Sequence, residues 1–289
     1  MPNANPWENI PPSAAGALLA QKPELIILDV RTPEEFLAHH LPGSALIPIQ
    51  ELGARLGELG SKRQPLLVHC EHGIRSRHAC EFLAQMGFVN LYNLSGGLAA
   101  WDPARDGALA HGATKAHDGP LPPRELGAWL PNHYALPAAG APALDLAAGR
   151  GRVTRYLRAE GFAVTAVDRD LNALAPLAAA SGITLQKMNL ETSEAPAQLA
   201  ALGRFQLLSV VNYLHRPLLP LLPRLVTPGG LLFYSTFVAE PRATTGPRNP
   251  DFLLQPGELA AIFSGARLLE YRERWNGSAA RASALWQCG

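Results

Sequence analysis

One of the few cysteines of the chain stands where an apolar run ends, in residues 66–78, LLVHCEHGIRSRH. The run that ends at Cys70 is typical of a buried strand, and the residues from Ser76 onward are typical of a helix. In open α/β sheets, ligand sites form at the carboxyl ends of strands, where loops lead into helices. Gly73 permits the left-handed backbone angle that turns successive N–H groups inward. We therefore expect the loop between strand and helix to surround the thiol with N–H donors.

Such a loop would make the Cys70 thiol a nucleophile. A thiol with a pKa of about 8.5 is only a few per cent ionised near pH 7. Lowering that pKa by about two units requires roughly 2.7 kcal/mol of preferential stabilisation of the thiolate. A helix N-terminus contributes at most about 2 kcal/mol, so the N–H groups of the loop must supply the remainder. The alternative is a small core residue at a strand end, and the residues around Cys70 decide between the two.

Two stretches near this cysteine are typical of one enzyme family. The first is CEHGIRS at 70–76 with the downstream run GFVNLYNLSGGLAAW at 87–101, and the second is LDVRTPEEFLAHHLPGSALIPI at 28–49. They resemble the signature of single-domain rhodanese sulfurtransferases over about residues 10–102. The resemblance implies an α/β domain that carries sulfur as a persulfide on Cys70 and delivers it to an acceptor nucleophile.

The same resemblance implies roles for residues around the cysteine. Arg75 would help to bind an anionic sulfur donor, and Asp29 with Arg31 would support the loop from below. The donor would lie against the loop residues Glu71, His72, Gly73, Ile74, Arg75 and Ser76. The loop counts six residues from Cys70 to Arg75, one fewer than in the phosphatases related to this family, which argues against phosphatase activity. The negative charge of Glu71 disfavours thiosulfate as the donor.

Cysteine usage favours a reducing compartment. The three cysteines have no paired spacing, which is typical neither of a disulfide framework nor of a zinc site. Consecutive strand and loop residues such as His69, Cys70 and His72 seldom converge on one ion, so no metal site is expected. Cys80 lies on an apolar stripe of the following helix, which favours a packed core thiol over a resolving partner for Cys70.

The stretch ALDLAAGRGRVTRYL at 143–157 is a second candidate site. Gly149 and Gly151 lie between an expected strand and an expected helix, and by themselves they are weak evidence for a cofactor. The next strand ends about twenty residues later in Asp168, where a carboxylate can accept both hydroxyls of a ribose. Thr154 stands at the position of the third glycine of the dinucleotide motif, so a bound pyrophosphate is disfavoured.

This stretch resembles motif I of class I S-adenosylmethionine-dependent methyltransferases, and the run FAVTAVD at 162–168 fits the strand that follows that motif. The resemblance covers about residues 124–289 and is nearest to the tellurite-resistance-like members. It implies a seven-stranded sheet with an antiparallel last strand, S-adenosylmethionine as the cofactor, and a methyl acceptor facing Asn212 and Tyr213. The cofactor-binding residues that it implies are Asp145, Ala147, Gly149 and Gly151 for the methionine side, Asp168 for the ribose, and Asn189 with Leu190 for the adenine.

The region of the expected acceptor site favours small-molecule chemistry. Methyl transfer depends mainly on the alignment of the nucleophile, and it needs no general base if the acceptor is already an anion. Residues 210–217, VVNYLHRP, lack the Asp/Asn-Pro-Pro-Tyr motif of nucleic-acid amino methylation. His215 and Arg216 are candidates for contact with an anionic acceptor, and a simple helix start is the alternative for His215. The segment 236–259 is long and poor in regular structure, which is typical of a loop that covers a substrate.

The elements that must position these residues form two α/β units. Residues 24–99 alternate short β-rich runs with helical stretches, which predicts a parallel sheet with helices packed on it. Together with the resemblance, this implies a rhodanese-like domain in residues 1–104. The run 105–123 is rich in Gly, Ala, Asp and Pro without periodicity, and we interpret it as a linker. The alternation resumes in residues 124–289, where we expect the Rossmann-like seven-stranded methyltransferase domain. The expected helices include 51–59, 171–180 and 214–224.

Charge and hydropathy limit the expected partners. The net charge is +1, and residues 1–120 hold 9 basic and 12 acidic residues against 16 and 12 in the remainder. This excess of basic residues in the second part is too small to indicate a nucleic-acid partner. The N-terminus MPNANPWENIPP lacks the basic and apolar regions of a leader, and no apolar stretch reaches about 18 residues. We expect a cytoplasmic protein without membrane attachment, whose partners are a small sulfur donor and a small methyl acceptor; the sequence does not indicate its oligomeric state.

The leading hypothesis is a bifunctional enzyme that transfers sulfane sulfur through Cys70 and methylates a small, soft, anionic acceptor such as a thiol or another chalcogen species. One alternative is a methyltransferase whose rhodanese-like unit is a non-catalytic sensing or binding module. The other alternative is tRNA modification, which would join thiolation to methylation.

Overall fold

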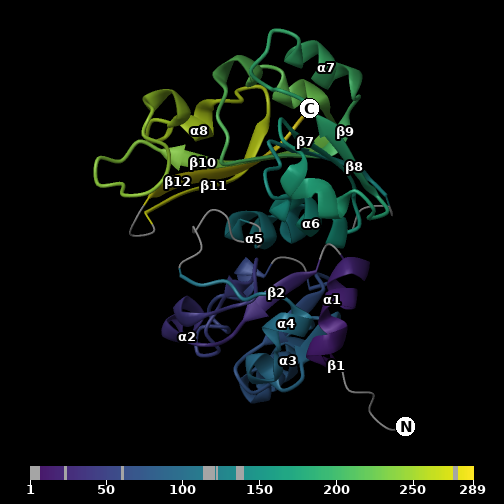
Figure 1. Ribbon diagram of the computed structural model, residues 1–289. Helices are drawn as coiled ribbons and strands as arrows, with labels where there is room; N and C mark the ends of the chain where they lie inside the picture. Colours follow the sequence, from purple (N-terminus) through teal and green to yellow (C-terminus); the bar gives the residue numbers. More distant parts are fainter. Residues whose placement is uncertain are drawn as a thin grey trace. The chain divides into compact units, whose positions relative to one another are not determined.

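A computed structural model of the protein describes residues 7–22, 25–59, 62–112, 121, 123–134, 140–275 and 279–289. The chain divides into two compact units, Met1–Ala128 and Trp129–Gly289. Each unit has its own β-sheet with helices packed on it (Figure 1). This arrangement confirms the predicted class of two α/β folds.

The N-terminal unit contains a five-stranded parallel sheet in the order β1-β5-β4-β2-β3. Its strands are β1 (Trp7–Ile10), β2 (Ile26–Asp29), β3 (Ala45–Leu46), β4 (Leu66–His69) and β5 (Leu91–Leu94). The α-helices assigned to it are α1 (Pro12–Gln21), α2 (Pro33–Ala38), α3 (Ile74–Gln85) and α4 (Pro103–Asp106), and the 3₁₀ helices are η1 (Leu56–Glu58) and η2 (Gly97–Ala100).

Both faces of this sheet are covered, which explains the continuous apolar runs of its central strands. All four residues of β4 are buried. Successive side chains of a strand point to opposite faces, and accordingly Leu66 and Val68 belong to one core cluster while Leu67 belongs to another. The carboxyl end of β4 is thus held rigidly from both sides, directly before the cysteine.

The C-terminal unit contains a seven-stranded sheet in the order β11-β12-β10-β9-β6-β7-β8, in which β12 is antiparallel to both of its neighbours. Its strands are β6 (Pro142–Leu146), β7 (Ala163–Asp168), β8 (Ile183–Lys187), β9 (Phe205–Val211), β10 (Val226–Val238), β11 (Arg267–Trp275) and β12 (Ala280–Gln287). The seven strands and the antiparallel last strand confirm the predicted Rossmann-like seven-stranded fold.

Helices of several kinds connect these strands. The α-helices are α6 (Arg152–Ala159), α7 (Ala195–Ala201) and α8 (Glu258–Ala261), and the 3₁₀ helices are η3 (Asn172–Leu177), η4 (Arg216–Leu218), η5 (Leu222–Leu225) and η6 (Pro250–Phe252). One further α-helix, α5 (Arg124–His133), lies in sequence across the border between the two units.

Three of the expected helices are largely irregular in the structure. The segment 171–180 forms only η3, which contains Pro176, and the segment 214–224 forms only η4 and η5, both of which begin with prolines near their first turn. Proline removes an N–H donor and clashes with the preceding turn, so these segments cannot continue as α-helices. The segment 51–59 contains two glycines and forms turns followed by η1. The edge strand β1 was not expected, and it pairs with β5.

The expected linker 105–123 falls partly outside the described residues, since 113–120 and 122 are not described. Before that gap the chain is attached to the N-terminal unit, because Ala110 forms an antiparallel bridge with His40. After it, Leu121 packs on the core of the same unit. The proposed domain bounds at 104 and 124 remain a prediction. Within the described part of the chain, no helix has the length and apolar character required to span a membrane.

Candidate active sites

The first site is the thiol loop (residues 70–76), which leads from β4 into α3. Helix α3 begins at Ile74, two residues earlier than expected, after Gly73 has adopted the left-handed angle φ 79°. The Sγ atom of Cys70 accepts hydrogen bonds from the backbone N–H of Gly73 at 3.1 Å and of Ser76 at 3.4 Å. The loop and the first turn of the helix therefore direct two N–H donors at the sulfur.

A side-chain relay extends from the sulfur into the sheet. The Oγ atom of Ser76 lies 3.4 Å from the Cys70 Sγ and donates to Asn93 Oδ1 at 2.6 Å. The amide of Asn93 in turn donates to Asn9 Oδ1 at 2.9 Å. A serine hydroxyl has a single proton, which is used toward Asn93, so in this arrangement the Cys70 thiol is the donor to Ser76. Ionisation of the thiol would remove that contact and leave the two backbone N–H donors.

The sulfur is covered. Cys70 is only 1% exposed and belongs to a core cluster that includes Ala79 and Cys80. On the outer side of the thiol loop, His72 is exposed and Ile74 is 57% exposed. A sulfur donor therefore reaches the Cys70 sulfur only when the thiol loop or the donor itself changes conformation.

Gly97, in η2, supports the thiol loop from beneath. The backbone N–H groups of Leu98 and Ala99 donate to the carbonyl oxygens of Cys70 and Glu71 at 2.9 and 2.8 Å. Gly97 has φ 62°, and a Cβ atom there would lie 2.4 Å from each of the two carbonyl oxygens. Sequence reasoning quoted this glycine only as part of the family pattern, and the structure supplies the reason, which is a close approach of two backbone segments.

A buried ion pair lies below the thiol loop. Asp29 and Arg31 are fully buried, with a shortest contact of 2.8 Å. The same guanidinium donates to Glu71 Oε2 at 2.9 Å and to the carbonyl of His39 at 2.5 Å. Glu71 therefore shares the guanidinium of Arg31 with Asp29, and the three groups together keep one negative charge. The sequence did not indicate this contact between residues forty positions apart.

Arg75 is already engaged by a carboxylate. Its Nη1 and Nη2 atoms donate to the two carboxylate oxygens of Glu35 at 2.7 and 2.6 Å. The Arg75 guanidinium lowers the pKa of Glu35 to about 2. Arg75 is partly exposed and has five N–H donors, so it can bind an anionic donor only with those that Glu35 leaves free.

Two further ionisable residues of this unit, His69 and Cys80, are buried. Burial lowers the pKa of His69 to about 4, and neither of its ring nitrogens has a hydrogen-bond partner among the described residues. Burial likewise raises the pKa of Cys80 to about 12, in agreement with a packed core thiol. In the part of the chain that the structure describes, no group of three His, Cys, Asp or Glu side chains could hold a metal ion.

The second site begins at the glycine turn between β6 and α6. The N–H of Gly149 donates to Asp168 Oδ2 at 2.8 Å, and the N–H of Asp170 donates to Asp168 Oδ1 at 3.0 Å. A Cβ atom at Gly149 would meet nothing closer than 4.0 Å, whereas one at Gly151 would lie 2.6 and 2.7 Å from two leucine side chains. Gly149 therefore borders open space, and Gly151 is needed for the packing of η3 against the turn.

Asp145 lies beneath this turn. Its Oδ2 atom accepts a hydrogen bond from the hydroxyl of Thr154 at 2.6 Å, and only 1% of the residue is exposed. Burial raises the pKa of Asp145 to about 7. Thr154, which sequence analysis noted only as the missing third glycine, is thus the partner of a buried carboxyl group. Ala147, between the strand and the glycines, has a positive φ of 55°.

Two expected adenine contacts differ in exposure. Asn189 is exposed, and its Oδ1 accepts the N–H of Glu191 at 3.1 Å. Leu190 is 5% exposed and packs in the core with Val167 and Met188. Of the pair, only Asn189 presents its side chain at the surface.

The end of β9 presents a strained residue and an unpaired hydroxyl. Asn212 has φ 59°, and its Oδ1 accepts a short hydrogen bond from Arg281 of β12. The hydroxyl of Tyr213 is buried and has no partner among the described residues. Burial raises the pKa of Tyr213 to about 12, with further contributions from the carboxylates of Glu191 and Asp168. The carboxylate of Asp168, the candidate ribose ligand, therefore acts electrostatically on the Tyr213 hydroxyl.

Together these residues fit a nucleoside-bearing cofactor. Asp168 offers a carboxylate at a strand end, Gly149 leaves room above the turn, and Tyr213 holds a polar atom without a partner. Arg281, which orients Asn212, was missed by sequence reasoning because an arginine in an alternating strand carries no local signal. Arg216 donates to the carbonyls of Asp251 and Leu253 and pairs with Glu258, so its guanidinium holds the loop that contains Asp251 and Leu253.

Comparisons with known proteins identify a family for the N-terminal part of the chain. A family model described as a rhodanese-like domain matches residues 12–104. The thiosulfate sulfurtransferase GlpE of Pseudoalteromonas translucida is 33% identical over 86 residues, which are 30% of this chain and 81% of that protein.

Two solved structures are similar to the larger part of the chain. TehB from Haemophilus influenzae has 18% identity and a TM-score of 0.43, over 53% of this chain and 59% of TehB, so the chain spans less than two thirds of that protein. An S-adenosylmethionine-dependent methyltransferase from Mesorhizobium loti has 16% identity and a TM-score of 0.43, over 56% of this chain and 97% of that one. The match of residues 12–104 and the identity to the sulfurtransferase show that the chain belongs to the rhodanese-like family.

Proposed function

We propose that the protein is a bifunctional enzyme, a sulfurtransferase that works through a Cys70 persulfide and an S-adenosylmethionine-dependent methyltransferase. The observation that carries the first activity is the pair of backbone N–H donors, from Gly73 and Ser76, directed at the Cys70 sulfur within a rhodanese-like domain. These donors are the groups that stabilise a thiolate and then the outer sulfur of a persulfide. We further propose a reducing, cytoplasmic location, because the three cysteines are free.

In the sulfur transfer, the Cys70 thiolate attacks the outer sulfur of a sulfane donor. The sulfur–sulfur bond of the donor breaks, and its electron pair leaves with the remainder of the donor as an anion. A nucleophilic acceptor then attacks the outer sulfur of the persulfide and releases the Cys70 thiolate. Arg31 keeps Glu71 turned toward the buried ion pair, and the acidic loop favours a donor less negatively charged than thiosulfate.

The C-terminal unit holds the cofactor at the carboxyl ends of β6, β7 and β8. Asp168 binds the ribose hydroxyls, the turn at Gly149 and Gly151 accommodates the methionine side, and Asn189 approaches the adenine. When bound, S-adenosylmethionine supplies an electrophilic methyl group on a sulfonium. Tyr213, with its unpaired hydroxyl, and Asn212 lie at the adjacent end of β9 and orient the acceptor.

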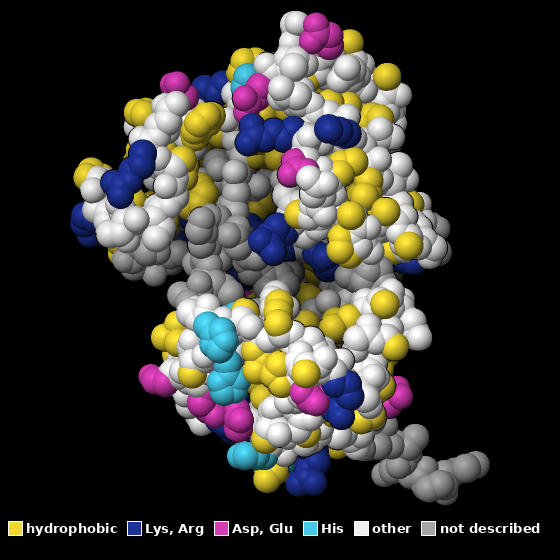
Figure 2. Space-filling model, in the orientation of Figure 1, with side chains coloured by type: hydrophobic (Ala, Val, Ile, Leu, Met, Phe, Trp, Pro, Cys, Tyr) yellow, Lys and Arg dark blue, Asp and Glu magenta, His cyan; other side chains and the backbone are white. Residues whose placement is uncertain are grey.

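The methyl acceptor is a small, soft anion, such as a thiolate or another chalcogen species. An acceptor that is already ionised needs no general base. The two acids at this site have other roles, since Asp145 accepts from Thr154 and Asp168 accepts from Gly149 and faces the ribose hydroxyls. A nucleic acid is a poor alternative on grounds of charge. On the face drawn in Figure 2, Lys and Arg side chains are interspersed with acidic, hydrophobic and other side chains over both units rather than joined in one basic surface.

Intact mass spectrometry tests the sulfur transfer. After incubation with a sulfane donor, the full-length protein is expected to gain one sulfur that cyanide removes, and C70S is expected to gain none. The matched control is C80S, which lacks the buried thiol of α3, the helix that follows the thiol loop, and should gain the sulfur normally. A sulfur adduct that persists in C70S, or none in the wild type with any donor, would contradict the persulfide.

Calorimetry tests the second activity independently. S-adenosylhomocysteine is expected to bind the wild type and to bind D168N at least tenfold more weakly, since the ribose loses an ionised partner. Binding that is unaffected by D168N would remove the basis for a cofactor at this sheet edge.

The burial of Cys70 favours one second candidate, in which the N-terminal unit is a sensing module. A cysteine residue that is 1% exposed reacts slowly with a donor. A persulfide that forms but is never discharged to cyanide or to a thiol would support sensing, and repeated turnover would exclude it.

A further inference from the structure

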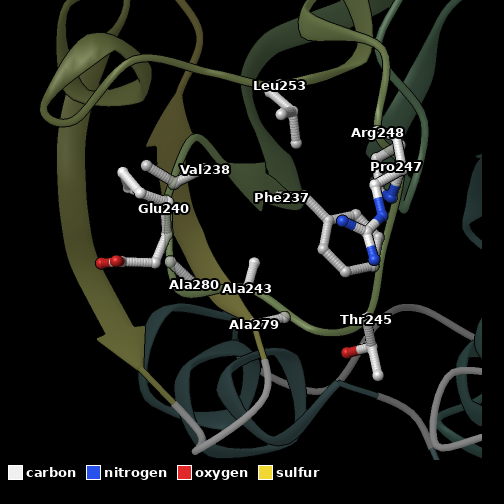
Figure 3. A pocket seen from close by; sticks show the side chains of 11 residues that line it. Phe237, Val238, Glu240, Ala243, Thr245, Pro247, Arg248, Leu253, Ala279 and Ala280 are labelled. Atoms are coloured by element: carbon white, nitrogen blue, oxygen red, sulfur yellow. The ribbon is translucent and has the colours of Figure 1, made fainter.

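A cavity lies under the loop that follows β10. Figure 3 shows its lining, which comes from the end of β10 at Phe237 and Val238, from the cover loop (residues 239–253), and from the start of β12 at Ala280. The cavity has a volume of about 130 Å³, whereas a single water needs roughly 10–15 Å³ of such space. It can therefore hold a ligand of about ten non-hydrogen atoms.

The cavity opens at the same edge of the sheet as the proposed cofactor site. Strands β6, β9 and β10 are consecutive neighbours and parallel, so their carboxyl ends lie together. Two strand spacings separate β10 from β6, which is about 10 Å. Asn212 lies between them, at the end of β9. The guanidinium of Arg281 donates a hydrogen bond to Asn212 and also lies 4.5 Å from the ring of Phe237, so it connects Asn212 to the lining of the cavity. A ligand in the cavity would thus extend toward the position of the transferred methyl group.

The charges around the cavity favour an anion. Glu240 is the acidic lining residue, and its carboxylate points away from the cavity in Figure 3 and is bound by Arg242 at 2.8 Å. Arg242 also lies over the ring of Trp275. Arg248 lines the cavity and makes no hydrogen bond or ion pair within the described part of the chain. One guanidinium is therefore left without a counter-charge at the cavity.

The rest of the lining is mainly apolar. It includes Phe237, Val238, Pro241, Ala243, Pro247 and Leu253. The cover loop is held in place by Arg216, which binds two of its carbonyls, and by a bridge between Val238 and Leu254. The cavity therefore suits a small molecule with an apolar body and one anionic end.

We propose that this cavity is the methyl-acceptor site and that it selects a small thiol carrying a carboxylate, which Arg248 binds. A guanidinium matches a carboxylate through two parallel N–H···O hydrogen bonds. The carboxylate holds one end of the acceptor at Arg248, and the sulfur extends toward Asn212 and Tyr213. This inference rests on the proposed methyltransferase activity and adds the class of acceptor.

The transfer balances without a further reagent. The acceptor thiol first loses its proton to solvent. Its thiolate sulfur then forms a bond to the methyl carbon, and the bond from that carbon to the sulfonium breaks, with the electron pair neutralising the sulfonium. The products are a methyl thioether and the uncharged thioether of the cofactor.

The test compares 3-mercaptopropionate with the neutral 3-mercapto-1-propanol in three full-length proteins. R248Q removes the guanidinium from the cavity. R224Q is the control, because Arg224 is also exposed but lies in η5, before the opposite end of β10. Calorimetry of each thiol without cofactor measures binding, and mass spectrometry of the thioether products measures methylation.

We expect R248Q to weaken binding of the carboxylate thiol and to raise its KM by ten- to a hundredfold, the loss typical of a bidentate ionic contact. Its effect on the alcohol should be within twofold, as should the effects of R224Q on both thiols. Equal loss for both thiols, or no loss for either, would overturn the assignment of Arg248. If binding of the carboxylate thiol depends on Arg248 but no thiol is methylated, the anion site is retained and the methyltransferase activity is contradicted. If S-adenosylhomocysteine binds but neither thiol does, the cofactor site is retained and the acceptor site is contradicted.

Discussion

Replacing Gly97 with alanine tests whether the thiol loop depends on the close backbone contact beneath it. The matched control is G43A in the same unit. Both glycines have positive φ values, 62° and 76°, but a Cβ atom at Gly43 would meet nothing within 4 Å. Both variants therefore carry the left-handed strain of about 1 kcal/mol, and only G97A adds a collision.

The size of that collision follows from the structure. A Cβ atom at Gly97 would lie 2.4 Å from the carbonyl oxygens of Cys70 and Glu71, and real Cβ contacts are not shorter than 3.0 Å. The two segments must therefore separate by about 0.6 Å. The hydrogen bonds from Leu98 and Ala99 to the same carbonyls would be weakened or lost, at about 1 kcal/mol each. We expect G97A to lose about 3 kcal/mol of stability and G43A about 1 kcal/mol.

Hydrogen–deuterium exchange of the full-length protein measures this difference. For peptides spanning β4 and the thiol loop, a difference of about 2 kcal/mol corresponds to roughly thirtyfold faster exchange in G97A than in G43A. Displacement of the loop also moves the Gly73 N–H away from the Cys70 sulfur, so persulfide formation should slow at least tenfold in G97A and remain nearly normal in G43A. Equal exchange and equal persulfide rates in the two variants would refute the argument that backbone contact at Gly97 positions the sulfur.

Three further predictions concern buried charges. R31K should destabilise the N-terminal unit by about 3 kcal/mol in urea unfolding, because lysine cannot contact Asp29 and Glu71 together. The surface control is R55K, whose partners Glu51 and Glu58 are partly exposed, and it should change stability by less than about 1 kcal/mol. Similar losses in both variants would contradict the role of burial. T154V should lower the stability of the C-terminal unit by about 1–3 kcal/mol, since Asp145 loses its hydroxyl donor, and an unchanged urea midpoint would show that the carboxyl finds another partner. Burial raises the pKa of Asp145 from 3.8 to about 7, so the folded state holds the carboxyl proton more tightly than the unfolded state does. This proton's contribution to stability is full below pH 3.8 and is lost as the pH rises toward 7, at up to about 1.4 kcal/mol per pH unit. D145N should flatten the dependence of stability on pH, and a slope that survives the substitution would assign it to another group.

Much of the fold is predictable because its signals are local. The apolar runs before Cys70 and Gly149 predict β4 and β6, and the structure confirms both strands. The alternation of runs also predicts two α/β units, and the methyltransferase resemblance implies seven strands with an antiparallel last strand; the structure shows both. The expected helix at 214–224 is wrong because its spacing of leucines suggests a helix, whereas its prolines permit only 3₁₀ turns.

The sites divide in the same way. The sequence alone indicates a cysteine at a strand end followed by a glycine, and a glycine turn followed by an acid at the next strand end, because residue type and spacing along the chain carry that information. Only the tertiary structure decides that Arg31 meets Glu71, that Gly97 packs on the thiol loop, and that Arg248 lines a cavity beside Phe237. These contacts join residues brought together by strand order and loop path, and a linear pattern contains no measure of the distances between them.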